Sequence, residues 1–292
     1  MNPSTLAVAV PCFEEAARIP ALGAALDALS PRPGAVLAVD DGSSDGTAAA
    51  LRREGFDVQI HERNLGLGAA RNSLWRRADS LGMQAIAFLD ADVLPPPDYL
   101  ARVCALMTDP TVAGVGGRNL DREPATWVDT WRGRFWAQEL GDAPLLDAPM
   151  LVGACATYRL SALRDVGGFN PAFRTNGEDV EIGRRLRQQG RALRYDPSLV
   201  VSHTRIDDPA DLLRACYRHC RDGMRATVAV PGRPADAPVL ALGMARKAVG
   251  APAAALIRRR DPKEALLGAA ACSAGLVGYA AGWLRPRAKG RS

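Results

Sequence analysis

The chain has 292 residues, of which 48% are hydrophobic and 24% are charged. That composition suits one large or two small soluble domains with a real core. Six cysteines are scattered without a Cys-X-X-Cys pair, which favours a reducing compartment. The first residues lack a basic stretch followed by an apolar one, so no signal peptide is expected.

Charge is divided unevenly along the chain. The net charge is +5, but residues 205–292 carry 16 Lys and Arg against 7 Asp and Glu, whereas residues 1–204 carry 21 against 25. An acidic body followed by a basic tail predicts a tail that meets an anionic surface. Because the tail is also strongly apolar, membrane phosphates fit this pattern better than nucleic acid does.

Two apolar runs, at residues 5–10 and 35–39, predict the first two strands of a buried sheet. The first ends in an acidic loop, Pro-Cys-Phe-Glu-Glu, and a helical pattern over residues 16–29 follows it. The second ends in Asp-Asp-Gly-Ser-Ser over residues 40–44, where carboxylates are well placed to hold a ribose or a base. The N-terminus of the next helix can take an anion. A capped turn is the alternative, since Ser and Asp are good N-caps.

A short strand is expected at residues 56–60, before the run Asn-Leu-Gly-Leu-Gly-Ala-Ala-Arg-Asn at residues 64–72. That run enters a helix that is expected to continue to about Ser80. Its glycines let the backbone approach a ligand. Arg71 stands about one turn inside the helix, where its side chain could reach a phosphate or a base.

The apolar run over residues 84–89 has the length of a strand and stops at two carboxylates, Asp90 and Asp92. Three prolines at residues 95–97 forbid its continuation. Such a run predicts a strand buried on both faces, whose C-terminal end is where an open α/β sheet puts its ligand site. Two aspartates there suit a hard divalent cation that carries phosphate oxygens. A solvated turn is the alternative.

A helix over residues 98–107 and a strand over 112–115 complete an alternating half, which predicts a parallel sheet with right-handed crossovers. The Trp- and Arg-rich stretch at 126–140 is expected to be a helix. It either covers the site or simply packs through an amphipathic face. A further strand is expected at 150–158.

The next helix begins after Gly177 and opens with the acids Glu178, Asp179 and Glu181. Acids at this end favour the helix dipole, but one carboxylate could also face a cleft. Two short strands are expected at residues 193–195 and 199–201, followed by a lone histidine. A histidine that follows a strand end is a candidate metal ligand.

Taken in this order, the motifs resemble those of a family 2 glycosyltransferase of the GT-A fold, over about residues 5–204. The resemblance rests on the joint occurrence of the acidic first loop, Asp-Asp-Gly-Ser-Ser-Asp-Gly-Thr, Asn-X-Gly-X-Gly-X-X-Arg-Asn, Asp-Ala-Asp, Gly-Glu-Asp-Val-Glu and the final histidine. It implies an α/β fold with a Rossmann-like, mostly parallel sheet flanked by helices. It also implies a catalytic domain over residues 1–205 and a helical, basic and apolar extension over residues 206–292.

The resemblance also assigns roles to residues of this chain. It implies a donor-binding set of Pro11, Glu14, Asp40, Asp41, Arg71 and Asp90. The two adjacent aspartates of this set match positions that contact the base and ribose. Asp92 and His203 match metal ligands, for Mg²⁺ or Mn²⁺. Asp179 matches the general base of inverting members, and Glu178 is its neighbour in the Glu-Asp pair.

The chemistry of transfer fits these residue types. The leaving diphosphate needs its charge neutralised, which a divalent cation does as a Lewis acid. The acceptor hydroxyl loses a proton as it attacks, and a carboxylate is a sufficient base. One displacement inverts the anomeric centre. No Gln-X-X-Arg-Trp motif follows the acidic helix, which favours transfer of a single sugar over chain extension.

The expected function is therefore inverting transfer of one sugar from a nucleotide-diphosphate donor, by family guess a UDP-sugar, to an acceptor hydroxyl. Cell-envelope or secondary glycoconjugate synthesis is the expected setting, with a glycan, a lipid-linked intermediate or a small molecule as acceptor. A catalytically silent nucleotide-sugar-binding protein is the alternative. A nucleotidyltransferase is disfavoured because the loop after the first strand is acidic. The sequence names neither the sugar, the nucleotide, the acceptor nor the oligomeric state.

The tail combines an Arg-rich amphipathic helix at residues 208–226, a linker at 231–238 and an uncharged stretch at 266–284. The last is just long enough to span a bilayer. Three interpretations stay open: a helix that packs on the body, one that lies on a membrane, and one that spans it. Close helix packing would be favoured by four small residues, Gly268, Gly275, Gly278 and Gly282. The expected location is cytoplasmic, peripheral or C-terminally anchored at the inner face of the cell membrane.

Overall fold

The computed structural model describes residues 1–120, 124–230 and 262–284. The chain divides into two compact units. The first contains residues 1–122 and 138–205, and the second contains residues 123–137 and 206–292. The linker predicted at 231–238 lies outside the described residues.

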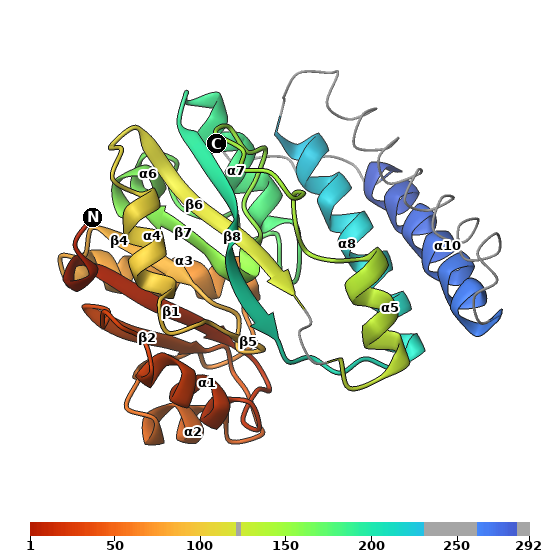
Figure 1. Cartoon of the computed structure of the whole chain (residues 1–292), viewed down its shortest axis with the longest axis horizontal. Helices are drawn as coiled ribbons and strands as arrows, with labels where there is room; N and C mark the ends of the chain where they lie inside the picture. The colour runs from red at the N-terminus through yellow and green to blue at the C-terminus, as the bar shows by residue number, and fades with distance from the viewer. Residues whose placement is uncertain (121–123, 231–261, 285–292) are drawn as a thin grey trace. The chain divides into compact units, whose positions relative to one another are not determined.

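The first unit is built on a sheet of eight strands in the order β3-β2-β1-β4-β7-β6-β8-β5 (Figure 1). The strands are β1 Leu6–Cys12, β2 Ala35–Asp40, β3 Asp57–Ile60, β4 Ala85–Phe88, β5 Val93–Leu94, β6 Val112–Leu120, β7 Ala156–Arg159 and β8 Ala192–His203. Strands β1 to β4 pair in parallel, as do β6 and β8, while β7 and β5 run antiparallel to their neighbours. The predicted α/β fold with a mostly parallel sheet is confirmed.

Helices cover both faces of this sheet. They are α1 Ile19–Asp27, α2 Thr47–Arg53, α3 Leu67–Ser80, α4 Tyr99–Leu106, α6 Leu160–Asp165 and α7 Glu178–Gln188, with 3₁₀ turns at Pro3–Thr5 and Gly153–Cys155. Strand β1 explains the layering, since alternate side chains point to opposite faces. Leu6 and Val8 share a core with α1, α2 and α4. Ala7 and Ala9 share another with α3, α6 and α7.

Three strand predictions differ from the structure, and the first is the strand expected at 112–115, which continues to Leu120 as β6. Residues 193–195 and 199–201 belong to one long strand, β8, because it pairs with β6 through two shifts of register. A Cβ at Gly117 would lie 1.7 Å from the carbonyl oxygen of Leu199, so the glycine lets the two backbones approach at such a shift. The strand expected at 150–158 is extended only from Ala156, after the 3₁₀ turn.

The second unit contains three described helices that share one small core: α5 Trp127–Phe135, α8 Pro209–Ala229 and α10 Pro262–Leu284 (Figure 1). That core is formed by Val128, Trp131, Leu212, Cys216, Leu267 and Ala271. The buried Arg132 of α5 pairs with Asp129 and with Asp207, which precedes α8. The helix predicted at 126–140 therefore packs with the helices of the tail.

Helices α8 and α10 approach closely through small residues, which is one of the interpretations that the sequence left open. A Cβ at Gly278 would lie 2.3 Å from the carbonyl oxygen of Tyr217, and one at Gly282 would lie 2.2 Å from that of Arg221. Within the described residues, α10 is also the one helix long and apolar enough to cross a membrane, with a mean hydropathy of 1.5. A third of that stretch is buried inside the structure, so this property alone is weak support for a span.

Candidate active site

The candidate site is organised around the end of β4, where Asp90 and Asp92 follow the buried strand. The backbone N–H of Val93 donates to the carbonyl of Asp90 at 3.2 Å and closes a turn. The short strand β5 then pairs Val93 with His203, the last residue of β8. This pairing places His203 Nε2 3.2 Å from Asp92 Oδ2, although 110 residues separate the two in the chain. The two predicted metal ligands therefore meet.

The chemistry of this pair suits a divalent cation. Although burial opposes ionisation, the hydrogen bond and charge of His203 hold the pKa of Asp92 below its usual value. The backbone N–H of Arg205 donates to His203 Nδ1 at 3.3 Å, which leaves Nε2 directed at the carboxylate. Two cis ligands about 2.1 Å from a Mg²⁺ ion lie about 3 Å apart, which the spacing of these two atoms approaches.

A metal at this position would need further ligands. Among residues 1–120, 124–230 and 262–284, no group of three His, Cys, Asp or Glu side chains could hold a metal ion. Mg²⁺ commonly binds proteins through one or two side chains and completes its shell with substrate phosphates and water. The pair therefore fits a cation that arrives with a diphosphate better than a permanent structural metal.

Arg71 joins three segments of the site from inside the protein. Its guanidinium donates to Glu178 Oε1 at 2.6 Å, to the carbonyl of Gly153 at 3.0 Å and to Asp90 Oδ1 at 3.1 Å. The Arg71 side chain is 1% exposed, whereas that of Asp90 is 34% exposed. The arginine expected beside the nucleotide is thus directed inward in this structure, and Asp90 is the partner that reaches solvent.

The two adjacent acids of α7 point to different environments. Glu178 is turned inward to Arg71, and burial raises its pKa to about 8, against the opposing charge of the arginine. Asp179 is only half-buried, and its Oδ2 accepts a hydrogen bond of 3.3 Å from the backbone N–H of Gly153. Of the pair, Asp179 is the carboxylate that is partly accessible from solvent.

The predicted donor-binding residues of β1 and β2 lie at the same end of neighbouring strands. Pro11 is buried in β1 opposite Val39, and Asp40 is buried and accepts from the N–H of Ser43 at 3.0 Å. Glu14 has a φ of 58° and accepts from the N–H and hydroxyl of Ser44. These contacts hold the two loops against each other.

Asp41 is bound on both carboxylate oxygens by the protein itself. It accepts from the backbone N–H groups of Leu65 at 2.8 Å and Gly66 at 2.7 Å. His61 Nδ1 lies 2.6 Å from the same carboxylate, and its Nε2 lies 2.9 Å from the hydroxyl of Ser73. Asp41 therefore fixes the loop that leads into α3. Its predicted contact with a ribose or base stays a prediction.

Several carboxylates lie close to Cys12, at the end of β1, and affect the pKa of its thiol. Its buried thiol has a raised pKa, first because of burial and then because of the charges of Glu15, Asp40 and Asp90. Burial likewise raises the pKa of Glu15, although its ion pair with Arg18 opposes this and Asp92 and Asp90 add to it. The ends of β1, β2 and β4 thus converge in one acidic region.

Two members of this arrangement were not expected from the sequence: His61 and Gly153. Gly153 has the clearest role, because its carbonyl accepts from Arg71 while its N–H donates to Asp179. A Cβ there would lie 3.0 Å from the Arg71 guanidinium. A glycine in a predicted strand can signal such a close approach, whereas His61 carries no comparable sequence signal.

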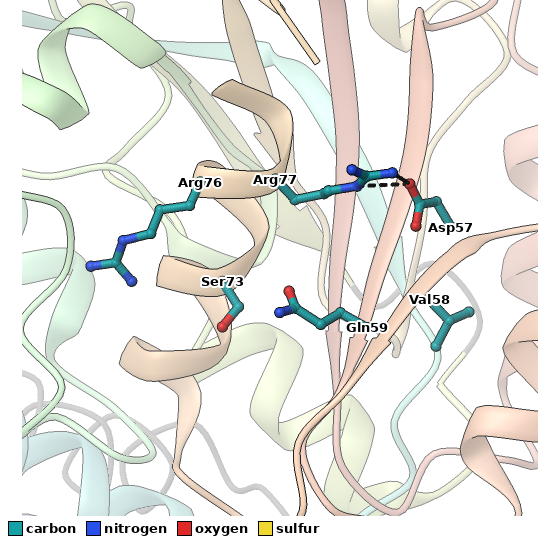
Figure 2. A pocket seen from close by; sticks show the side chains of 6 residues that line it. All are labelled: Asp57, Val58, Gln59, Ser73, Arg76 and Arg77. Atoms are coloured by element: carbon teal, nitrogen blue, oxygen red, sulfur yellow. Dashed lines mark hydrogen bonds and ion pairs between the residues drawn. The ribbon is translucent and has the colours of Figure 1, made fainter. Parts of the chain in front are cut away.

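A pocket of about 580 Å³ lies elsewhere, between strand β3 and helix α3 (Figure 2). It is lined by Asp57, Val58, Gln59, Ser73, Arg76 and Arg77. Figure 2 shows the pairing of Arg77 with Asp57. The Arg77 Nη2 and Asp57 Oδ2 atoms lie 2.7 Å apart. None of the predicted donor, metal or base residues lines this pocket, so we do not place the donor there.

Solved structures are similar to this chain over most of its length. A mannosyltransferase from Pyrobaculum calidifontis in complex with GDP-Man and Mn²⁺ is 22% identical, with a TM-score of 0.65 over 93% of this chain and 87% of that one. The structure of GalNAc-T7 with UDP, GalNAc and Mn²⁺ is 18% identical, with a TM-score of 0.53 over 70% of this chain and 43% of that one. These similarities show the fold.

Sequence relatives point the same way. A pre-mycofactocin glycosyltransferase from Mycobacterium tuberculosis is 33% identical over 58% of this chain, which spans only 37% of that protein. An N-acetylglucosaminyl-diphospho-decaprenol L-rhamnosyltransferase from the same organism is 28% identical over 67% of this chain and 76% of its own length. The family model described as "Glycosyl transferase family 2" matches residues 7–167, more than half of the chain. Because this match covers more than half of the chain, the chain belongs to glycosyl transferase family 2.

Proposed function

We propose that the protein is an inverting glycosyltransferase that moves a single sugar from a nucleotide-diphosphate donor to an acceptor hydroxyl with the help of a divalent cation. The observation that carries this proposal is the pairing of Asp92 with His203 at 3.2 Å, next to Asp90 at the end of β4. In an open α/β sheet, this strand end is where a ligand is expected.

Asp92 and His203 would hold the cation, which we propose to be Mg²⁺ or Mn²⁺. When bound, such an ion neutralises the charge that develops on the leaving diphosphate. Similar structures determined with GDP-Man and Mn²⁺ or with UDP and Mn²⁺ support this assignment. Asp90 stands beside the Asp92–His203 pair, and part of its carboxylate is open to solvent. There it can accept a hydrogen bond from a hydroxyl of the nucleotide sugar.

Asp179 is the proposed general base. The backbone N–H of Gly153 orients one of its oxygens, and its half-buried side chain leaves room for an acceptor. Glu178 is committed to Arg71 inside the protein, so it positions the start of α7 rather than taking the proton. A single displacement with one base inverts the anomeric centre, unlike a mechanism that passes through a covalent sugar intermediate.

The proposed donor site is completed by Pro11, Glu14, Asp40, Asp41 and Arg71. Each of these residues either contacts the donor or fixes a loop of the site.

We propose a UDP-sugar as donor. One mycobacterial relative is named for a diphospho-decaprenol acceptor, which supports an acceptor in cell-envelope or glycoconjugate synthesis. Transfer of one sugar is supported by the absence of a Gln-X-X-Arg-Trp motif after α7. We place the reaction at the cytoplasmic face of the cell membrane.

Thermal unfolding in the presence of nucleotides tests the donor site. UDP, GDP and dTDP would each be added with and without Mn²⁺. A ligand at a hundredfold excess over its Kd stabilises by about 2.7 kcal/mol, or roughly 5–10 °C in Tm for a domain of this size. We expect a shift with one nucleotide, lost without the metal and in Asp92→Ala. Asp142→Ala, at an exposed aspartate outside the site, is the control.

The same samples separate the enzyme from a silent binding protein. A shift accompanied by turnover of the matching nucleotide sugar supports transfer. A shift without turnover of any donor and acceptor pair supports the nucleotide-sugar-binding alternative. The absence of any shift, with every nucleotide and with metal present, would contradict the donor site itself.

A further inference from the structure

Helix α10 presents a stripe of apolar side chains to solvent along one side. Leu266 is 72% exposed, Leu276 51%, Val277 61% and Trp283 65%. Their spacing follows the helical repeat, so these four residues lie on the same side, with the small exposed residues Ala269, Ser273 and Ala280 between them. We call these seven residues the apolar stripe.

The opposite side of α10 is already occupied. Leu267 and Ala271 lie in the core shared with α5 and α8, and Gly278 and Gly282 touch the backbone of α8. The helix is therefore apolar on both sides, although the residues that the structure describes cover only one of them. Singly exposed apolar residues are ordinary on protein surfaces, but a stripe along more than four turns indicates a partner.

The charges at the two ends of α10 identify the chemistry of that partner. Residues 265–292 contain no Asp or Glu, whereas Lys263 lies near the start of the helix and Arg285, Arg287, Lys289 and Arg291 come after it in the sequence. Trp283 stands directly before this basic end. A long apolar face, a tryptophan at its boundary and flanking basic residues together suit an anionic phospholipid surface.

We propose that α10 lies in the plane of an anionic lipid bilayer, with the apolar stripe at the boundary between headgroups and acyl chains. Its basic flanks contact the lipid phosphates, while α8 covers the side that faces away from the lipid. This inference rests on the membrane location proposed above, but it does not depend on the transfer reaction.

The packing against α8 favours this orientation over a membrane span. A spanning α10 would have to leave α8 or carry it into the bilayer. Helix α8 contains the charged residues Arg214, Arg221, Asp222 and Arg225, which are costly in hydrocarbon. Leaving α8 would break the close contacts at Gly278 and Gly282 and expose the core around Leu267. An interfacial position requires neither change.

Co-sedimentation of the full chain with vesicles tests the inference. Vesicles of phosphatidylcholine alone would be compared with vesicles that also contain phosphatidylglycerol. We expect binding to the anionic vesicles and at least about a tenfold loss of affinity in Leu266→Asp and Leu276→Asp, because each puts a charge in the apolar stripe that would contact the lipid. Leu146→Asp is the matched control, since Leu146 is 71% exposed and lies outside α10.

The inference also predicts how bound protein is released. High salt should weaken binding, because it screens the basic flanks. Alkaline carbonate should release the protein from membranes of expressing cells, as it does peripheral proteins. Unchanged Tm values in the two Asp variants would show that they still fold.

Several results would overturn the inference. It is wrong if neither vesicle type binds, if both Asp variants bind like the control, or if carbonate leaves the protein in the membrane. A dimer that disappears in Leu276→Asp, together with no vesicle binding, would instead show that a second copy covers the stripe. Nucleotide-induced Tm shifts measured on the same variants report on the donor site separately. A failure of the membrane inference is therefore distinguishable from a failure of the proposed donor site.

Discussion

The guanidinium of Arg71 donates a hydrogen bond of 2.6 Å to the carboxylate of Glu178, and both side chains are buried. The two residues lie 107 positions apart, on helices α3 and α7. Arg71 also holds Asp90, at the end of β4, and the carbonyl of Gly153. The guanidinium of Arg71 thus links the end of β4, which precedes the proposed metal ligand Asp92, to helix α7, which carries the proposed base Asp179.

Replacing Arg71 by Met should destabilise the protein above about pH 8, where Glu178 is ionised, because it leaves a buried charge without its partner. The expected loss is about 3–5 kcal/mol in the free energy of unfolding. Denaturant unfolding followed by fluorescence measures it. The double variant Arg71→Met/Glu178→Leu should recover part of the loss, since no charge is then left unpaired at Glu178. Equal stability of Arg71→Met and the wild type would contradict a structural role for the pair.

The buried Glu178 should also make stability depend on pH. Burial raises its pKa to about 8 from the ordinary value of 4.5, so the folded state favours the protonated form. The stabilisation from protonation is complete below pH 4.5 and is lost as the pH rises through about 8. In Glu178→Gln, the free energy of unfolding should decrease less over this pH range, by an amount on the order of a few kcal/mol.

Urea unfolding at a series of pH values between 5 and 9, without metal or nucleotide, tests this dependence. The slope of unfolding free energy against pH is compared between variant and wild type, which removes the contribution of other groups. Glu62→Gln, at an exposed glutamate, is the control and should keep the wild-type slope. An identical slope in Glu178→Gln would mean that Glu178 stays ionised throughout.

Much of this site could be predicted from strand ends alone. The run over 84–89 was expected to be buried and to end at a ligand site, and the structure places Asp90 and Asp92 directly after β4. The meeting of Asp92 and His203 depends on β5, a strand of two residues that pairs with the end of β8. No local pattern in the sequence marks so short a strand, so the resemblance to a family supplied the pairing.

The inward direction of Arg71 could not be predicted, because a residue one turn inside a helix can face either way. Its orientation is decided by partners distant in sequence, namely Glu178 and the rings of Phe88 and Phe169, whose centroids lie 5.5 and 5.7 Å from the guanidinium.

The packing partners of the helix at 126–140 could not be predicted from its own residues either. Its own pattern shows an amphipathic face, but the side chains of α8 and α10 determine what that face covers.

Asp179→Asn should abolish transfer and leave nucleotide binding intact, because an amide cannot take the acceptor proton but keeps the shape of the side chain. The expected loss in kcat is about 10²–10⁴-fold, typical for removal of a general base. Initial rates with saturating donor measure it, and the nucleotide-induced Tm shift checks the donor site. Near wild-type rates in this variant would exclude Asp179 as the base.

His203→Gln should weaken metal binding while the fold is kept. Loss of a ligand is expected to raise the apparent Kd for Mn²⁺, measured by titration in the presence of nucleotide, by at least about tenfold. His219→Gln, at an exposed histidine of α8, should bind the metal as the wild type does. The assignment of His203 as a ligand fails if both variants bind Mn²⁺ equally well.

Gly278→Ala tests the contact that holds α10 against α8. In an open helix position, Gly to Ala is expected to stabilise by about 1 kcal/mol, because alanine restricts the unfolded chain. At Gly278, however, the added Cβ would lie 2.3 Å from a backbone oxygen of α8, so the helices must separate. Overpacking of this kind costs about 1–3 kcal/mol, enough to reverse the sign.

Gly223→Ala on α8 is the matched control, because nothing lies within 4 Å of a Cβ at that position. We expect Gly223→Ala to raise Tm slightly and Gly278→Ala to lower it, with faster amide hydrogen exchange in both α8 and α10 of the latter. If the two variants shift Tm in the same direction, the two helices do not pack backbone to backbone. In that case α10 would be free to leave α8, and the argument for an interfacial rather than a spanning orientation would lose its main support.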